Sequence, residues 1–384
     1  MVVIPAVVEG VALLAAIVPF GLHRWNMHKW TVAHSQTHVP QPSEEEIPLT
    51  VLLPVWNEAR IIEKKLDDLA KQSVSFSLLL IDSASDDRTV ELAKKWLQEH
   101  PHAFTTSEVL VMGQREGKTS AVIRALNHLN QNANDGLVCM TDADARLGRG
   151  VLRRLMDWFS DPMIGAVGAL PQRTNAREEE LGHRAMWENM RVSESYVDST
   201  PFLEGSCMMW RQRGFSSEQL NVYSNADDAQ IATGIRLNGL RSIHDSEIYF
   251  EDIAPTSPEG QRRQKVRRGQ GLQRLLVSHR KLWFDRRLGT FAKILRREAH
   301  FHLLAPIFFT GAGFAAILRW TIIGLAGMPN GTLAVLHGSL TLIELSCLTA
   351  WLLNRQGIHV PLLSTIGTLF SGMEHLLVAH WHSL

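Results

Sequence analysis

Two pairs of carboxylates have the residue types and spacing for chemistry on a phosphorylated substrate. Asp142 ends the run GLVCMTD, and Asp144 follows it after one small residue. At a strand end, two such carboxylates can project to one side, where hard oxygen ligands suit Mg²⁺ or Mn²⁺ holding a diphosphate. Asp227 and Asp228 precede the helical stretch AQIATGIRLNG, and one of them is suited to act as a base on a hydroxyl group. A solvated turn and a favourable helix N-terminus remain the non-catalytic explanations of these pairs.

The segment GQREGKT, residues 113–119, follows a β-prone run and opens a helical stretch, as a phosphate-binding P-loop does. A P-loop has four residues between its glycines, whereas three residues separate Gly113 from Gly117. Because a P-loop closes around a phosphate through backbone N–H groups, the missing residue counts against one. Lys118 can still contact a phosphate in another architecture, and the alternative is a solvated lysine at a capped helix start.

β-prone apolar runs alternate with amphipathic helical stretches from residue 49 onward. The runs are LTVLLPV, SLLLID, EVLVM, GLVCMTD and IGAVGAL, and the helical stretches are 58–72, 87–98, 117–129 and 148–159. This alternation predicts an α/β fold with a mainly parallel sheet covered by helices. In such sheets ligands bind beyond the carboxyl ends of the strands, and the polar clusters WNE, DSASDDRT, GQREGKT and DADAR stand at those ends.

Both ends of the chain are poor in charge. Residues 2–22 contain one charge, Glu9, and no positive residue precedes them, which counts against a cleaved signal peptide. At ~1.5 Å per residue, a helix of this length is about enough to cross a bilayer core of ~30 Å. We expect a transmembrane anchor at 1–24, a linker at 25–48, a catalytic domain at 49–282 and two or three transmembrane helices in 300–384. The positive residues that follow the anchor predict an integral protein of the cell membrane with a cytoplasmic catalytic domain.

The charge distribution adds a second membrane-related prediction. Lys+Arg and Asp+Glu both total 39, so net charge argues neither for nor against an anionic partner. Because the basic residues concentrate in one segment, Gln261 to Arg297, on an otherwise acidic chain, no nucleic acid is expected as a partner. Residues 283–299 interleave Leu288, Phe291, Ile294 and Leu295 with basic residues. This pattern predicts an amphipathic helix on an anionic membrane surface.

The polar clusters occur in one order along residues 49–271. That order is PVWNE, IDSASDDRT, GKTSA, TDADA, a Gly-Ser loop, ADDAQ and QRRQKVRRGQG. It resembles the membrane-bound family-2 glycosyltransferases, which have a GT-A (Rossmann-like) nucleotide-sugar-binding fold. The resemblance implies that Pro54 and Glu58 lie beside the nucleoside, that Asp82 contacts the base, and that Lys118 lies near the nucleotide.

The same resemblance implies roles for the carboxylates. Asp144 matches the firmer metal ligand of the family, and Asp142 would contribute to both the metal and the donor. Gly205, Ser206 and Asp227 would lie near the acceptor. The general base would be Asp228.

The last motif departs from the family's QxxRW pattern. Gln264 to Arg268 fits it best, with arginine in place of tryptophan, and a second register places Val266 at that position. The resemblance implies that Gln264, Arg267 and Arg268 lie beside the donor. In processive synthases the tryptophan lies near the terminal acceptor sugar, so its loss counts against a polymerase, unless Trp187 or Trp210 replaces it.

These inferences predict an integral-membrane, metal-dependent, inverting glycosyltransferase. It would move a sugar from a UDP- or GDP-linked donor to a lipid or glycolipid acceptor, assisted by Mg²⁺ or Mn²⁺. One alternative within the family is a processive polysaccharide synthase. The alternatives from other classes are a membrane-anchored, P-loop-like nucleotide hydrolase and a catalytically silent membrane scaffold.

Overall fold

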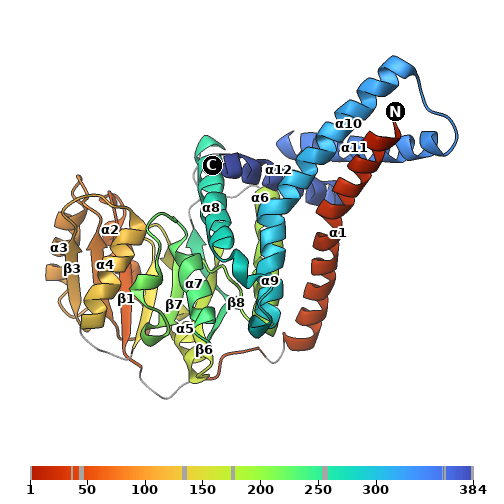
Figure 1. Cartoon of the computed structure of the whole chain (residues 1–384). Helices are drawn as coiled ribbons and strands as arrows, with labels where there is room; N and C mark the ends of the chain where they lie inside the picture. The colour runs from red at the N-terminus through yellow and green to blue at the C-terminus, as the bar shows by residue number, and fades with distance from the viewer. Residues whose placement is uncertain are drawn as a thin grey trace.

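A mixed β-sheet with helices on both faces forms one part of the molecule, and long helices lie beside it (Figure 1). The computed structural model describes residues 2–35, 38–42, 47–131, 136–173, 178–252, 258–356, 358 and 360–381. The sheet has the strand order β3-β2-β1-β4-β7-β6-β8-β5. Its strands are β1 (Leu49–Val55), β2 (Ser77–Asp82), β3 (Ser107–Val111), β4 (Leu137–Thr141), β5 (Arg146–Leu147), β6 (Ile164–Arg173), β7 (Cys207–Arg211) and β8 (Arg241–Asp252).

The strand directions divide the sheet into two halves. Strands β3, β2, β1 and β4 are parallel to one another, as the alternation of runs and helices predicts. Beyond them, β7 is antiparallel to both β4 and β6, β8 is parallel to β6, and the short β5 is antiparallel to β8. The predicted α/β fold is confirmed. Strands β5, β7 and β8 were not predicted, because their pairing depends on contacts between distant segments.

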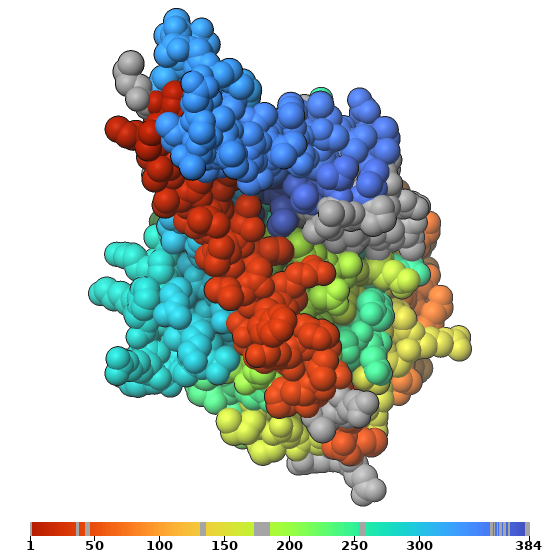
Figure 2. Space-filling model, turned by 90° about the vertical axis from the view of Figure 1, so that its right-hand side faces the viewer, coloured from red at the N-terminus to blue at the C-terminus, as the bar shows by residue number. Residues whose placement is uncertain are grey.

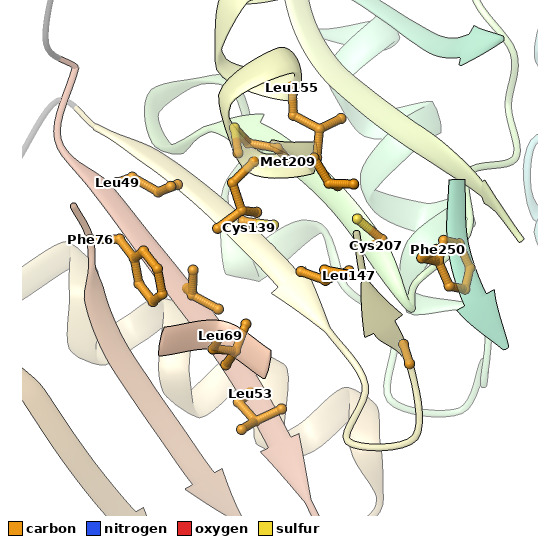
Figure 3. Close-up of a cluster of buried hydrophobic side chains, with 14 of the residues drawn as sticks. Leu49, Leu53, Leu69, Phe76, Cys139, Leu147, Leu155, Cys207, Met209 and Phe250 are labelled. Carbon is orange, nitrogen blue, oxygen red and sulfur yellow. The ribbon is translucent and has the colours of Figure 1, made fainter. Parts of the chain in front are cut away.

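Helices cover both faces of the sheet, and β1 supplies side chains to both. Leu49 and Leu53 point into one buried cluster with Leu69 and Phe76 (Figure 3), whereas Leu52 belongs to the cluster on the opposite face. Full burial of each leucine contributes about 1.5–3 kcal/mol. The covering helices are α2 (Ile62–Ala70), α3 (Thr89–Glu99), α4 (Lys118–Gln131), α5 (Val151–Asp157), α6 (Glu178–Val197) and α7 (Asp227–Leu237).

Three helices of the described residues are long and apolar enough to cross a membrane: Val3–His34, Thr290–Ala326 and Thr332–Leu353. The first is α1, which lies beside α6 and α10 (Ala305–Ala326), and the last lies within α11 (Thr332–Gln356). Helix α12 (Pro361–Trp381) follows and is not one of the three. Helix α1 continues to His34, so the first part of the predicted linker at 25–48 is helical; the stretch contains no Gly or Pro.

The predicted interfacial helix at 283–299 differs in length and in surroundings. Helix α9 spans only Thr290–Ala299, and a π-helical turn, His300–Leu304, joins it to α10. The side chains of Phe291 and Leu295 pack in a buried cluster with Leu275 and Leu276 of α8 (Pro258–Ser278). The apolar side chains of Phe291 and Leu295 are therefore covered by α8.

Charged residues that interrupt the apolar runs pair with one another. Arg319 of α10 is fully buried, and its Nε lies 2.7 Å from Oε2 of Glu9 in α1. Its Nη2 lies 2.8 Å from Oε1 of Glu344 in α11. Because a buried charge is costly unless it is paired, this network ties the three helices together. Figure 2 shows α1, in red, running across the near face of the molecule.

Candidate active site

The loop after β4 presents the two predicted metal-binding carboxylates. Ala143 and Ala145 are buried, whereas Asp142 is half-buried and Asp144 is exposed. The small residues therefore point into the fold and the carboxylates point outward. This alternation places both acids at the carboxyl end of a parallel strand, where ligands of such sheets bind.

A lysine that the sequence analysis missed supports this loop from inside. The fully buried Nζ of Lys65 donates to Oγ1 of Thr141 at 2.9 Å and to the carbonyl of Ala145 at 2.7 Å. Burial lowers the pKa of Lys65. Thr141 Oγ1 in turn donates to the carbonyl of Ser206 at 2.8 Å. The signal in the sequence was the position of Lys65 three residues after Ile62, on the apolar face of α2.

Lys118 lies between the two carboxylate pairs. Its Nζ is 2.6 Å from Oδ1 of Asp142 and 3.8 Å from Oδ2 of Asp227. Burial alone would raise the pKa of Asp142, but the Lys118 ammonium outweighs it and the pKa is lowered. Burial opposes the charge of Lys118 as well, yet the surrounding carboxylates hold its pKa above the usual range. The ammonium thus offsets part of the negative charge of the site.

The predicted base is held by the predicted acceptor loop. The backbone N–H of Gly205 donates to Oδ2 of Asp228 at 3.0 Å, and Ser206 Oγ donates to Oδ2 of Asp142 at 2.9 Å. A Cβ at Gly205 would lie 3.3 Å from both Asp228 Oδ2 and Lys118 Nζ, so glycine permits this close approach. Burial, then the charges of Asp227 and Glu204, raises the pKa of Asp228 to about 6.

Helix α8 places the predicted arginines, Arg267 and Arg268, near the two carboxylate pairs. Asn225 Nδ2 donates to the carbonyl of Arg267 at 3.1 Å, which fixes α8 beside the carboxylate pair. Arg268 Nη1 lies 3.9 Å from Oε2 of Glu204, and Gln264 is half-buried about one turn earlier. Glu204, which also pairs with Arg191, was missed because nothing in its local sequence indicates a role.

The loops after β1 and β2 form the predicted nucleoside side of the site. Asn57 has a left-handed backbone (φ 58°), and its side-chain Nδ2 donates to Asp86 at 2.6 Å. Asp82 is fully buried, and its Oδ2 accepts the backbone N–H of Ser85 at 2.9 Å, so it shapes the loop. Pro54 is half-buried at the end of β1, where it pairs with the residue preceding Asp82.

One contact and one electrostatic effect connect the nucleoside side to the rest of the site. The Arg115 guanidinium lies 3.4 Å from the ring centroid of Trp56, which joins the loop after β3 to the loop after β1. Burial, then the charges of Asp144 and Asp142, raises the pKa of Glu58 to about 7. The loops that the sequence analysis placed at the carboxyl ends of the strands therefore do meet.

The available carboxylate ligands fit a hard divalent cation that is bound together with a phosphate group. Asp144 and Asp142 supply carboxylate oxygens, and the described residues contain no group of three or more His, Cys, Asp or Glu that could hold a metal alone. Mg²⁺ commonly uses one or two carboxylates and completes its shell with water and substrate phosphates. Two carboxylates are thus sufficient for this kind of site.

Residues 50–219 match the family described as Glycosyl transferase family 2. The chain therefore contains a family-2 glycosyltransferase domain, with the GT-A fold that its motif order predicted. The curated glycosyltransferase AglE of Haloferax volcanii is 23% identical over 151 residues, which cover 38% of this chain and 47% of that protein. The match thus spans about half the length of this relative.

The fold likeness extends over nearly the whole chain. The structure of the mannosyltransferase PcManGT from Pyrobaculum calidifontis, in complex with GDP-Man and Mn²⁺, superposes with a TM-score of 0.74 at 24% identity. The superposition covers 98% of this chain and all of the other. It therefore includes the long helices as well as the sheet domain.

Proposed function

We propose that this protein is an integral-membrane, inverting glycosyltransferase that moves a sugar from a nucleotide-diphosphate sugar to a lipid or glycolipid. One observation carries the proposal. Asp142, Lys118, Asp228 and the Gly205–Ser206 loop converge through direct contacts at the carboxyl end of the sheet. A site with carboxylates for a metal, a cation between them and a carboxylate of raised pKa has the parts that sugar transfer requires.

The donor would bind with its nucleoside between the loops after β1 and β2, next to Pro54, Glu58 and Asp82. Asp144 and Asp142 would hold Mg²⁺ or Mn²⁺, which offsets the negative charge of the leaving diphosphate. Arg267 and Arg268 extend from α8 toward the same region and would add positive charge, since guanidinium geometry suits phosphate oxygens. The GDP-Man and Mn²⁺ in the PcManGT structure support a donor and metal of these classes.

Asp228 would take the proton from the acceptor hydroxyl as that oxygen attacks the anomeric carbon. The attack comes from the face opposite the diphosphate, so a single displacement inverts the configuration. A carboxylate with a pKa of about 6 is mostly ionised at neutral pH and is a stronger base than an ordinary aspartate. The N–H of Gly205 would keep its Oδ2 oriented during the transfer.

A membrane acceptor agrees with the position of α8. This helix packs on α9, which continues into the candidate span Thr290–Ala326, and it also packs on α12. Arg24 and Lys29 follow the first apolar run, which supports a cytoplasmic catalytic domain.

The processive alternative has less support. Arg268 stands where the polymerase tryptophan is expected, and Trp210 is fully buried in the core, so it cannot form an acceptor platform. Trp187 is half-buried beside Phe301 and His302 and remains the one candidate that the sequence analysis named.

The test is to incubate purified protein with labelled GDP-mannose or UDP-N-acetylglucosamine, Mn²⁺ and membrane lipids. We expect discrete lipid-extractable products that EDTA and Asp228→Asn abolish. A ladder of long water-soluble polysaccharide would replace the proposal with the processive alternative. Hydrolysis of ATP or GTP without any sugar transfer would favour the nucleotide hydrolase.

A further inference from the structure

An apolar cavity of about 510 Å³ lies among α1, α10, α11 and α12. Its walls include Leu13, Phe309, Gly313, Leu348, Phe370 and Met373. The volume is within the range of small-molecule sites, about 300–1,000 Å³. The cavity is open on one side and its exposed lining is mostly apolar, which favours a hydrocarbon occupant. No residue of the site described above lines it.

The carboxylates at the cavity wall are paired. Glu9 and Glu344 both bind Arg319, and Glu374 of α12 has its Oε1 3.9 Å from Nη2 of Arg262 in α8. The first two carboxylates share one guanidinium, which offsets one of their two negative charges. The third pair connects the cavity wall to the helix that carries Arg267 and Arg268.

Helices α8 and α12 are in close contact. A Cβ at Gly269 would lie 3.3 Å from side-chain atoms of both Ala379 and Leu376. Gln273 Nε2 donates to the carbonyl of Leu376 at 3.0 Å and to that of His302 at 2.8 Å. Side-chain amide bonds to two helices fix the position of α8 between the cavity and the sheet domain.

A row of three cations follows α8 from this wall to the active site. Arg262, Lys265 and Arg268 are spaced three residues apart, which places neighbours on adjoining turns. At ~1.5 Å per residue the row is about 9 Å long. It begins at Glu374 and ends at Arg268, 3.9 Å from Glu204, which precedes the Gly205 loop that holds Asp228.

We propose that the cavity holds the hydrocarbon tail of the acceptor and that Arg262 and Lys265 bind its anionic, phosphate-bearing head group, which then ends next to Arg268 at the donor site. This inference rests on the proposed function and specifies its acceptor class. The occupant is an amphiphile because an apolar cavity and a cationic row adjoin through α12. The row extends about 9 Å along the helix axis, which leaves room for a head group larger than one phosphate, such as a diphosphate or a phosphate-linked sugar.

The experiment uses the full chain in detergent and a C20 alkyl diphosphate with a diazirine near the end of its chain. The matched probe is the C20 alcohol with the same diazirine. Gly313→Phe fills the cavity, whereas Gly311→Phe adds the same side chain to the same helix outside the cavity lining. Among the described residues, no atom lies within 4 Å of a Cβ built at either glycine, so neither change forces a clash there.

We expect the diphosphate probe to label peptides of α10, α11 and α12 that line the cavity. Gly313→Phe should lower this labelling at least fivefold, and Gly311→Phe should leave it within twofold. Arg262→Gln combined with Glu374→Gln should raise the half-saturating concentration of the diphosphate about tenfold and leave that of the alcohol unchanged. The paired change avoids an uncompensated carboxylate at position 374.

Labelling needs no sugar donor, so it separates this inference from the proposed function. Labelling that is insensitive to Gly313→Phe, or spread over the outer faces of α1 and α10, would overturn the cavity assignment. Equal affinity for the diphosphate and the alcohol would overturn the head-group assignment. If labelling follows the prediction but no sugar is transferred, the assignment of the cavity to a hydrocarbon tail would stand, and only the proposed function would be contradicted.

Discussion

Replacing Lys65 with methionine tests how the metal-binding loop is held in place. The lysine is fully buried and donates to Thr141 and to the carbonyl of Ala145, on either side of Asp142 and Asp144. Methionine has a similar length and no charge. The substitution therefore removes both hydrogen bonds and also the cost of burying an ammonium group.

The two changes act in opposite directions on stability. Loss of a partner for a buried carbonyl costs about 1–3 kcal/mol, and removal of a desolvated charge offsets part of this cost. The pKa of Lys65 is lowered by burial, which agrees with a substantial desolvation cost. We therefore expect a small change in the melting temperature. Residues that orient metal ligands typically contribute about 10–100-fold in metal affinity, so the half-saturating Mn²⁺ concentration should rise by that factor.

The assay is Mn²⁺-dependent binding of the nucleotide sugar, measured by calorimetry alongside a thermal melt. Lys64→Met is the matched control, because Lys64 is the neighbouring lysine of α2 and its side chain is exposed. Thr141→Val removes the hydroxyl that joins Lys65 to Ser206 and should weaken Mn²⁺ dependence in the same direction. The reasoning would be refuted if the Lys65→Met protein kept both the wild-type melting temperature and the wild-type half-saturating Mn²⁺ concentration.

Four further predictions concern the site and its loops. Asp228→Asn should lower transfer about 10²–10⁴-fold while donor affinity stays within twofold; wild-type turnover would exclude Asp228 as the base. In the wild type, kcat/KM should fall as the pH drops through about 6, because protonated Asp228 cannot accept a proton, and a pH–rate profile that is flat from 5 to 7 would contradict this. Asp144→Ala should abolish metal-dependent donor binding and Asp142→Ala should weaken it less, which calorimetry with Mn²⁺ or EDTA would measure. Ala84→Gly should raise stability by about 0.5–1 kcal/mol in thermal melts, since φ is 57° there, whereas Ala93→Gly in α3 should lower it.

The alternation of apolar runs and helical stretches was enough to predict that the candidate site residues of the parallel strands converge. Each strand of the parallel half ends in a polar cluster, and parallel strands align their carboxyl ends, so Glu58, Asp82 and Asp142 had to approach one another. The supporting contacts were not predictable in this way. Lys65 and Glu204 act through partners about 80 and 13 residues distant, and their local sequence does not identify those partners.

The segment at 283–299 shows why an amphipathic pattern identifies a buried face without identifying what covers it. Phe291 and Leu295 were assigned to a lipid surface, and they pack instead on Leu275 and Leu276 of α8. This contact has a consequence for the site. Helix α8 is held by α9 on one side and by α12 on another, so the position of Arg268 depends on both. A change in the packing of α9 or α12 would therefore alter the position of Arg268.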